Sequence, residues 1–214
     1  MTEPSPATQA PAAEPKAAFS PLALLQVLRP KQWPKNGALL SALIFAHKLS
    51  DPGAVAKAFA SVAVFSLLSG GVYTLNDLGD REKDRLHPEK KKRPIASGAL
   101  PVPVAAVWGL LCLVGALVAG FTISSGLGKV CAAYVAMQVA YTFKLKQVAI
   151  LDVMIIALGF VMRVVAGAAA IEVPVSNWLY LCTLCLALFL GFCKRRHELL
   201  LLEGGAEGHR KNLA

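Results

Sequence analysis

Residues 58–84 read AFASVAVFSLLSGGVYTLNDLGDREKD, an apolar run that ends abruptly in acidic side chains. The apolar part, residues 58–75, contains no charged residue. Its length is close to the ~20 residues that one helix needs to cross a bilayer. The stretch therefore predicts a transmembrane helix with a group of carboxylates at one end.

The acidic residues that follow are spaced as on one face of a helix. Asn76 and Asp80 are four positions apart, Asp77 and Asp80 three, and Asp80 and Asp84 four. Stacked oxygen ligands repel one another unless a cation lies between them, and Mg²⁺ prefers such ligands together with substrate phosphates. We therefore expect a magnesium–diphosphate site held by these four residues. The alternative is a solvated helix end that is balanced by its basic neighbours, Arg81, Lys83 and Arg85.

The whole chain has the composition of a membrane protein. It has 214 residues, of which 56% are hydrophobic, with a mean hydropathy of +0.55. A typical soluble domain is about 45–50% apolar. The sequence predicts an all-α, polytopic transmembrane bundle with about six membrane helices. We expect these helices at residues 37–49, 58–75, 101–123, 126–143, 148–171 and 175–193.

The predicted domain organisation has three parts. Residues 1–20, rich in Ala, Pro, Glu and Thr, are expected to form a disordered tail without the features of a signal peptide. Residues 21–198 are expected to form the transmembrane catalytic domain, and residues 199–214 a polar C-terminal segment.

The basic residues define an orientation. The net charge of +9 could indicate nucleic-acid binding, but the Lys and Arg residues lie between apolar runs, which favours a membrane protein and no nucleic-acid partner. With alternating spans and the 76–100 loop inside, one basic residue lies within a span, Arg163, and only three lie outside: Lys48, Lys57 and Lys129. This asymmetry predicts that the acidic run is on the cytoplasmic side of a multi-pass plasma-membrane protein.

Further polar residues are candidates for substrate contacts. Arg93 precedes Pro94, and its planar guanidinium group can donate two hydrogen bonds to a phosphate. Asp152 and Arg163 are charged residues within a predicted span, about three helical turns apart, where both can face one cavity. A cluster before that span and a residue after the last span complete this set: Tyr141, Lys144, Lys146 and Lys194. Lys194 begins the run Lys194-Arg195-Arg196, which is equally well explained as a stop-transfer anchor.

Together, these motifs resemble those of the UbiA-type intramembrane prenyltransferase superfamily. The Asn-Asp-x-x-Asp-x-x-x-Asp pattern at 76–84 is similar to the first signature of that superfamily. Several flanking motifs resemble the decaprenyl-phosphate phosphoribosyltransferase branch. These are Arg29-Pro30-Lys31-Gln32-Trp33-Pro34-Lys35-Asn36, His87-Pro88, Arg93-Pro94-Ile95-Ala96-Ser97-Gly98, Leu145-Lys146, Leu151-Asp152, Gly159-Phe160-x-x-Arg163 and Lys194-Arg195-Arg196-x-Glu198.

The resemblance implies an activity and its partners. It implies a Mg²⁺-dependent transfer of 5-phosphoribose from phosphoribosyl diphosphate to a polyprenyl (decaprenyl) phosphate, releasing pyrophosphate and supplying cell-wall arabinan synthesis. Asp77, Asp80 and Asp84 would hold the metal with Asn76, and Asp152 could stabilise an oxocarbenium-like transition state. The expected substrate-binding residues are Lys35, Asn36, Asn76, Arg93, Tyr141, Lys144, Lys146, Arg163 and Lys194.

Alternatives remain at this point. An aromatic prenyltransferase of the same superfamily is one, although the second motif offers Asp152 with two lysines instead of several carboxylates. A transporter or a structural membrane subunit is another. The resemblance implies roughly nine membrane helices where this chain has room for about six. We therefore expect a fragment or a truncated gene product, and its oligomeric state, including a homo-oligomer, is left open.

Overall fold

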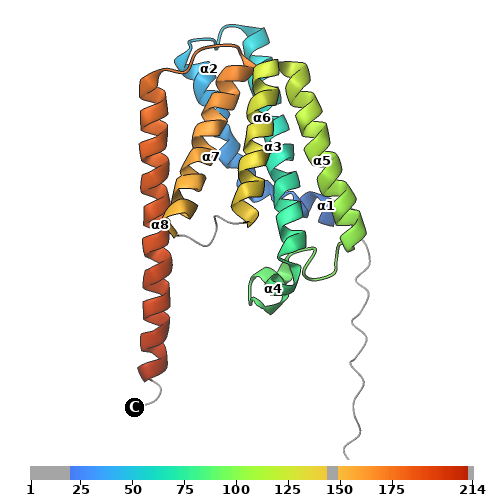
Figure 1. Cartoon of the computed structure of the whole chain (residues 1–214), viewed down its shortest axis with the longest axis vertical. Coiled ribbons are helices and arrows are strands. Elements are labelled where there is room, and N and C mark those ends of the chain that lie inside the picture. Colours follow the sequence, from blue (N-terminus) through green and yellow to red (C-terminus); the bar gives the residue numbers. More distant parts are fainter. Residues whose placement is uncertain (1–19, 144–148, 212–214) are drawn as a thin grey trace, which may run out of the picture.

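The computed structural model describes residues 20–143 and 149–211. Every regular element in these ranges is a helix, which confirms the predicted all-α fold (Figure 1). The elements are α1 (Pro21–Val27), η1 (Pro30–Leu40, a 3₁₀ helix), α2 (Ser41–Phe45), α3 (Pro52–Gly79), α4 (Arg81–Leu86), η2 (Lys90–Lys92, also 3₁₀), α5 (Val102–Ile123), α6 (Ser125–Phe143), α7 (Ala149–Ala170) and α8 (Asn177–Lys211).

Helix α3 forms the centre of the bundle and leads to the acidic run. Asp51 caps its first turn by accepting hydrogen bonds from the amides of Gly53 and Ala54 at 2.9 and 3.1 Å, and Pro52 occupies the first helical turn. The helix then continues for 28 residues and ends at Gly79. It packs most extensively against α5, where a Cβ on Gly71 would lie 2.9 Å from the carbonyl oxygen of Gly109. Backbones that approach this closely admit only the smallest residues.

Four helices in the described ranges are long and apolar enough to cross a membrane: α3, α5, α7 and α8. These correspond to four of the predicted spans. The predicted span at residues 126–143 is helix α6, which lies in the bundle but is not apolar enough over its length to be counted with these four.

The first predicted span is not one continuous helix. Residues 37–49 instead contain the end of the 3₁₀ helix η1, the five-residue helix α2 and a turn. Pro34 lies inside η1, where it removes a backbone donor. Gly167 of α7 also approaches η1 so closely that a Cβ on it would overlap the carbonyl oxygen of Leu39. Irregular backbone at membrane depth is tolerated where protein surrounds it, and α3 and α7 flank η1.

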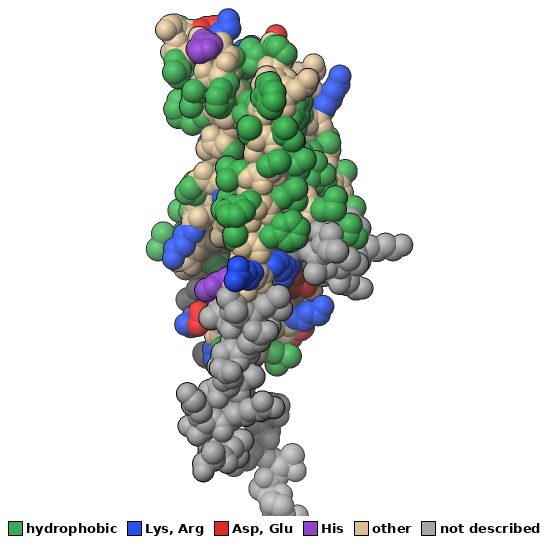
Figure 2. Space-filling view, turned by 90° about the vertical axis from the view of Figure 1, so that its left-hand side faces the viewer, with side chains coloured by type: hydrophobic (Ala, Val, Ile, Leu, Met, Phe, Trp, Pro, Cys, Tyr) green, Lys and Arg blue, Asp and Glu red, His purple; other side chains and the backbone are tan. Residues whose placement is uncertain are grey.

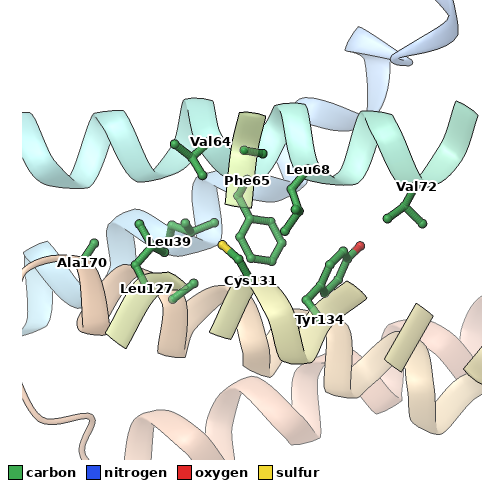
Figure 3. Packing of buried hydrophobic residues seen from close by; sticks show 11 residues of the cluster. Leu39, Val64, Phe65, Leu68, Val72, Leu127, Cys131, Tyr134 and Ala170 are labelled. Carbon is green, nitrogen blue, oxygen red and sulfur yellow. The ribbon is translucent and has the colours of Figure 1, made fainter. Parts of the chain in front are cut away.

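The hydrophobic cluster shown in Figure 3 lies where α3, α5, α6, α7 and η1 meet. The rings of Phe65 and Tyr134 are tilted against each other at a centroid distance of 4.8 Å. Leu39, Leu68 and Leu127 are fully buried around them. This core holds the irregular η1 against the regular helices.

The face of the molecule shown in Figure 2 is largely apolar, with charged side chains gathered towards its two ends. The chain runs from α1 to α2 at the opposite end, and the long helices then alternate in direction (Figure 1). The 80–100 segment and the ends of α6 and α8 therefore share one end of the bundle, as predicted. Helix α8 continues through Lys211, beyond the predicted boundary at residue 198. The domain boundaries stay predictions, and residues 1–19 of the expected tail lie outside the described ranges.

Candidate active site

Two buried carboxylates face each other across one guanidinium group at the end of α3. Asp77 and Asp84 are 4% and 3% exposed. Nη1 of Arg93 donates to Oδ1 of Asp77 at 3.0 Å and to Oδ2 of Asp84 at 2.6 Å. The structure thus brings together three of the residues that the sequence singled out.

The acidic run is not one uninterrupted helix face. Helix α3 ends at Gly79, Asp80 is its C-terminal cap, and α4 starts at Arg81. The helix is thus interrupted between Asp77 and Asp84, and both carboxylates nevertheless reach Arg93. Asp80, which lies between Asp77 and Asp84 in the sequence, is half-buried. Its role as a metal ligand stays a prediction.

Arg29 is a site residue that sequence analysis did not select. Its Nη2 forms a short ion pair with Oδ1 of Asp77, and its guanidinium lies over the ring of Tyr73, 5.1 Å from the centroid. The backbone of Arg29 is left-handed, with φ 53° and ψ 64°, at the turn between α1 and η1. One signal was available, because Arg29 and Arg93 each precede a proline within a basic stretch.

Asn76 links α3 to α6 beside the carboxylates. Its Oδ1 accepts a 2.9 Å hydrogen bond from the hydroxyl of Thr142. Tyr141, the neighbour of Thr142, is half-buried at the same end of α6. Both predicted substrate-binding residues therefore lie near the end of α3, and their contacts with substrate stay predictions.

Arg163 lies in a second, more deeply buried polar network. It is 5% exposed and donates through Nε to Oδ1 of Asn36 at 2.8 Å and through Nη1 to the carbonyl of Gly159 at 2.7 Å. Its guanidinium is also within 5.3–5.6 Å of three aromatic ring centroids, those of Phe65, Tyr134 and Phe160. Asn36 in turn donates to the hydroxyl of Ser66 at 3.0 Å. This network fixes η1 between α3 and α7.

The remaining predicted residues are placed only in part. Lys35 is exposed on η1, next to Asn36. Asp152 lies in α7 and Lys194 in α8, but their side chains are outside what the structure describes. Lys144 and Lys146 lie outside the described residues. The predicted shared cavity of Asp152 and Arg163 therefore stays a prediction.

The carboxylate pair has the chemistry of a cation site. Asp77 and Asp84 present oxygen atoms to the same cationic nitrogen, and carboxylates are the ligands that Mg²⁺ favours. Within the described residues, no cluster of three or more metal-binding side chains is assembled. The two buried carboxylates therefore fit a magnesium ion that shares its coordination shell with water and phosphate.

Comparisons with known proteins identify the family of this chain. The model of the UbiA prenyltransferase family matches residues 37–197. The chain belongs to the UbiA prenyltransferase family. A decaprenyl-phosphate phosphoribosyltransferase from Mycolicibacterium smegmatis is 37% identical over 89% of this chain and 61% of the relative. A protein of the same name from Mycobacterium tuberculosis is 35% identical over 89% of this chain and 64% of the relative.

A solved structure shares the fold. A UbiA homologue from Archaeoglobus fulgidus, determined with DMAPP and Mg²⁺, superposes with a TM-score of 0.64 at 23% identity. The match covers 78% of this chain and 60% of that one. The present chain thus spans roughly three fifths of the length of these UbiA relatives. It is a helical membrane protein of this family.

Proposed function

We propose that this chain transfers 5-phosphoribose from phosphoribosyl diphosphate to a polyprenyl phosphate such as decaprenyl phosphate, with release of pyrophosphate. The observation that carries the proposal is the buried pair Asp77 and Asp84, bridged by Arg93, at one end of a UbiA-family bundle. The names of the mycobacterial relatives support the choice of substrates.

We assign two carboxylates to the metal half of a magnesium–diphosphate site and two arginines to its diphosphate half. Asp77 and Asp84 would hold Mg²⁺, which when bound neutralises charge on the departing pyrophosphate. Arg93 and Arg29 would hold the phosphate oxygens through their planar forks, which match phosphate geometry. We also expect Asn76 and Asp80 to contribute to the metal site.

The reaction needs a displacement at the anomeric carbon of the ribose. An oxygen of the lipid phosphate attacks this carbon and forms the new C–O bond while the bond to pyrophosphate breaks in line. The lipid phosphate is an anion at neutral pH, so the step needs no general base. We expect Asp152 to stabilise the positive charge that develops on the ribose ring.

The basic residues favour this donor over a prenyl diphosphate. Phosphoribosyl diphosphate carries an additional phosphate, and the acceptor is itself an anion. We expect five basic residues to bind the phosphates of the donor and the acceptor: Lys35, Lys144, Lys146, Arg163 and Lys194. The proposed location is the plasma membrane, with the site on the cytoplasmic side and the product entering cell-wall arabinan synthesis.

A direct assay separates this proposal from its alternatives. Membranes that contain the chain are incubated with Mg²⁺, decaprenyl phosphate and phosphoribosyl diphosphate labelled in the ribose. Label in the lipid fraction is expected, and chelation of the metal should abolish it. Absence of lipid-linked label, combined with turnover of a prenyl diphosphate and an aromatic acceptor, would establish the prenyltransferase alternative instead.

A further inference from the structure

Two arginines share one carboxylate oxygen in the candidate active site. Oδ1 of Asp77 forms ion pairs with both Arg29 and Arg93, and Arg93 extends to Asp84. The carboxylate side chains are 5% exposed and the two arginine side chains 28% exposed. Two negative and two positive groups thus form a neutral, largely buried cluster.

We propose that Arg29 is a diphosphate-binding residue and that, with Arg93, it stands in for the metal ion on Asp77 and Asp84 until a diphosphate arrives. When a diphosphate binds, the two carboxylates would hold Mg²⁺ and the two guanidinium groups would turn to the phosphate oxygens. The inference rests on the proposed function only in requiring a substrate with a diphosphate group.

The charges explain why such an exchange needs the diphosphate. Mg²⁺ alone would add two positive charges beside two guanidinium groups at a site where the dielectric constant is low, and the repulsion would weaken its binding. A magnesium–diphosphate complex carries net negative charge, which the same guanidinium groups attract. The arginines therefore oppose binding of the free metal and favour binding of the complex.

The positions of the arginines allow this movement. Arg29 lies in the turn between α1 and η1, and Arg93 directly follows η2, so both side chains start outside the long helices. The ring of Tyr73 lies beneath the Arg29 guanidinium and can keep contact with it as the group turns. Arg163 differs, because buried protein groups accept hydrogen bonds from its Nε and Nη1. The acceptors of Arg163 are neutral, whereas Arg29 pairs with a carboxylate, which a metal ion would attract away from it.

The test compares two ligands on purified full chain in detergent. Mn²⁺ alone is titrated and followed by loss of the free-ion electron paramagnetic resonance signal. Binding of ³²P-pyrophosphate is measured by equilibrium dialysis at saturating Mg²⁺. For Arg29→Gln we expect Mn²⁺ to bind about tenfold more tightly and pyrophosphate about tenfold more weakly than in the unsubstituted chain.

Two further variants make the result specific. Lys92→Gln removes a charge from an exposed side chain that pairs only loosely with Glu89, at 3.7 Å, and should change neither affinity. Arg29→Lys keeps the charge but loses the fork, so Mn²⁺ affinity should stay near that of the unsubstituted chain while pyrophosphate affinity falls to an intermediate value. Arg29→Lys also decides the question if Arg29→Gln fails to fold, because a pyrophosphate affinity equal to that of the unsubstituted chain overturns the inference.

In Arg29→Gln, the affinity for Mn²⁺ is expected to rise while the affinity for pyrophosphate falls. These opposite changes distinguish the inference from a purely structural role of Arg29 and from the proposed function. If Arg29→Gln weakens both ligands, Arg29 merely holds the site together and the inference is wrong. Unchanged Mn²⁺ binding also overturns it, whatever the transferase assay shows. If the unsubstituted chain binds no pyrophosphate, the proposed function fails together with the diphosphate part of the inference, whereas tighter Mn²⁺ binding by Arg29→Gln would still establish the competition between arginine and metal.

Discussion

Arg163, on α7, donates a 2.8 Å hydrogen bond from Nε to Oδ1 of Asn36, on η1, across 127 positions of sequence. Both side chains are buried. Among the residues that the structure describes, the hydrogen-bond acceptors of Arg163 are all neutral. A charged group in the membrane interior is costly, so these few hydrogen bonds matter for the fold.

The first prediction concerns this contact. Asn36→Leu should lower the midpoint of thermal unfolding in detergent, because Nε of Arg163 is left without an acceptor in a buried site, at a cost of about 2–4 kcal/mol. Thr122→Ala is the matched control, since its exposed hydroxyl bonds only to Ala119 in its own helix. That control should change stability by less than about 0.5 kcal/mol. Equal midpoints for the two variants would contradict the proposed importance of the contact.

The second prediction concerns the approach of α7 to η1. Gly167→Ala should reduce the yield of folded protein, because the added methyl group would overlap the backbone of Leu39. Gly115→Ala places the same methyl group on α5 in open space and should be neutral or stabilising by up to about 1 kcal/mol. The measurement is the monodisperse fraction after detergent extraction. Similar yields would show that α7 can move away from η1.

The third prediction concerns the acidic residues. Asp77→Asn, Asp80→Asn and Asp84→Asn should each lower magnesium-dependent transfer about 100-fold or more, because each removes a charged group that we propose as a ligand of the metal. Glu82→Gln is the control within the same run, since its side chain is 74% exposed and its nearest cations are 3.6 Å away. Transfer should be unchanged in that variant. Full magnesium-dependent turnover by Asp77→Asn would rule out the proposed metal site.

The fourth prediction concerns sidedness. With the exposed cysteines of α8 replaced by alanine (Cys182, Cys185 and Cys193), a single new cysteine is introduced at one end of the bundle. Ser50→Cys, beyond α2, should react with a membrane-impermeant maleimide on intact cells. Ser97→Cys, in the loop before α5, should react only after the cells are opened. The reverse pattern would place the candidate site outside.

The long helices were predictable because their causes are local. Residues 101–123 were expected to form a span, and α5 occupies Val102–Ile123. Without water, every backbone group must find a partner, and an apolar run of this length satisfies them within one helix. The same reasoning failed for residues 37–49, because hydropathy does not distinguish an α-helix from the 3₁₀ backbone that Pro34 and the contact with Gly167 impose.

The acidic residues of the candidate site could be predicted from the sequence, whereas only one of its two arginines was. The spacing of Asp77 and Asp84 identified them as one site, although the break after Gly79 was not foreseen. Arg93 was selected for its position before a proline. Arg29 was not selected, since its contact with Asp77 spans 48 positions and depends on how α1 packs against the bundle.

By itself, the sequence determined where the long helices lie, their alternation and the end of the bundle where charge gathers, because apolar length and the cost of buried charge act on short segments. Only the tertiary structure decided which cations meet the carboxylates of Asp77 and Asp84, and that Arg163 is held by Asn36. Such contacts join distant segments, and they exist only once close packing has placed η1 between α3 and α7.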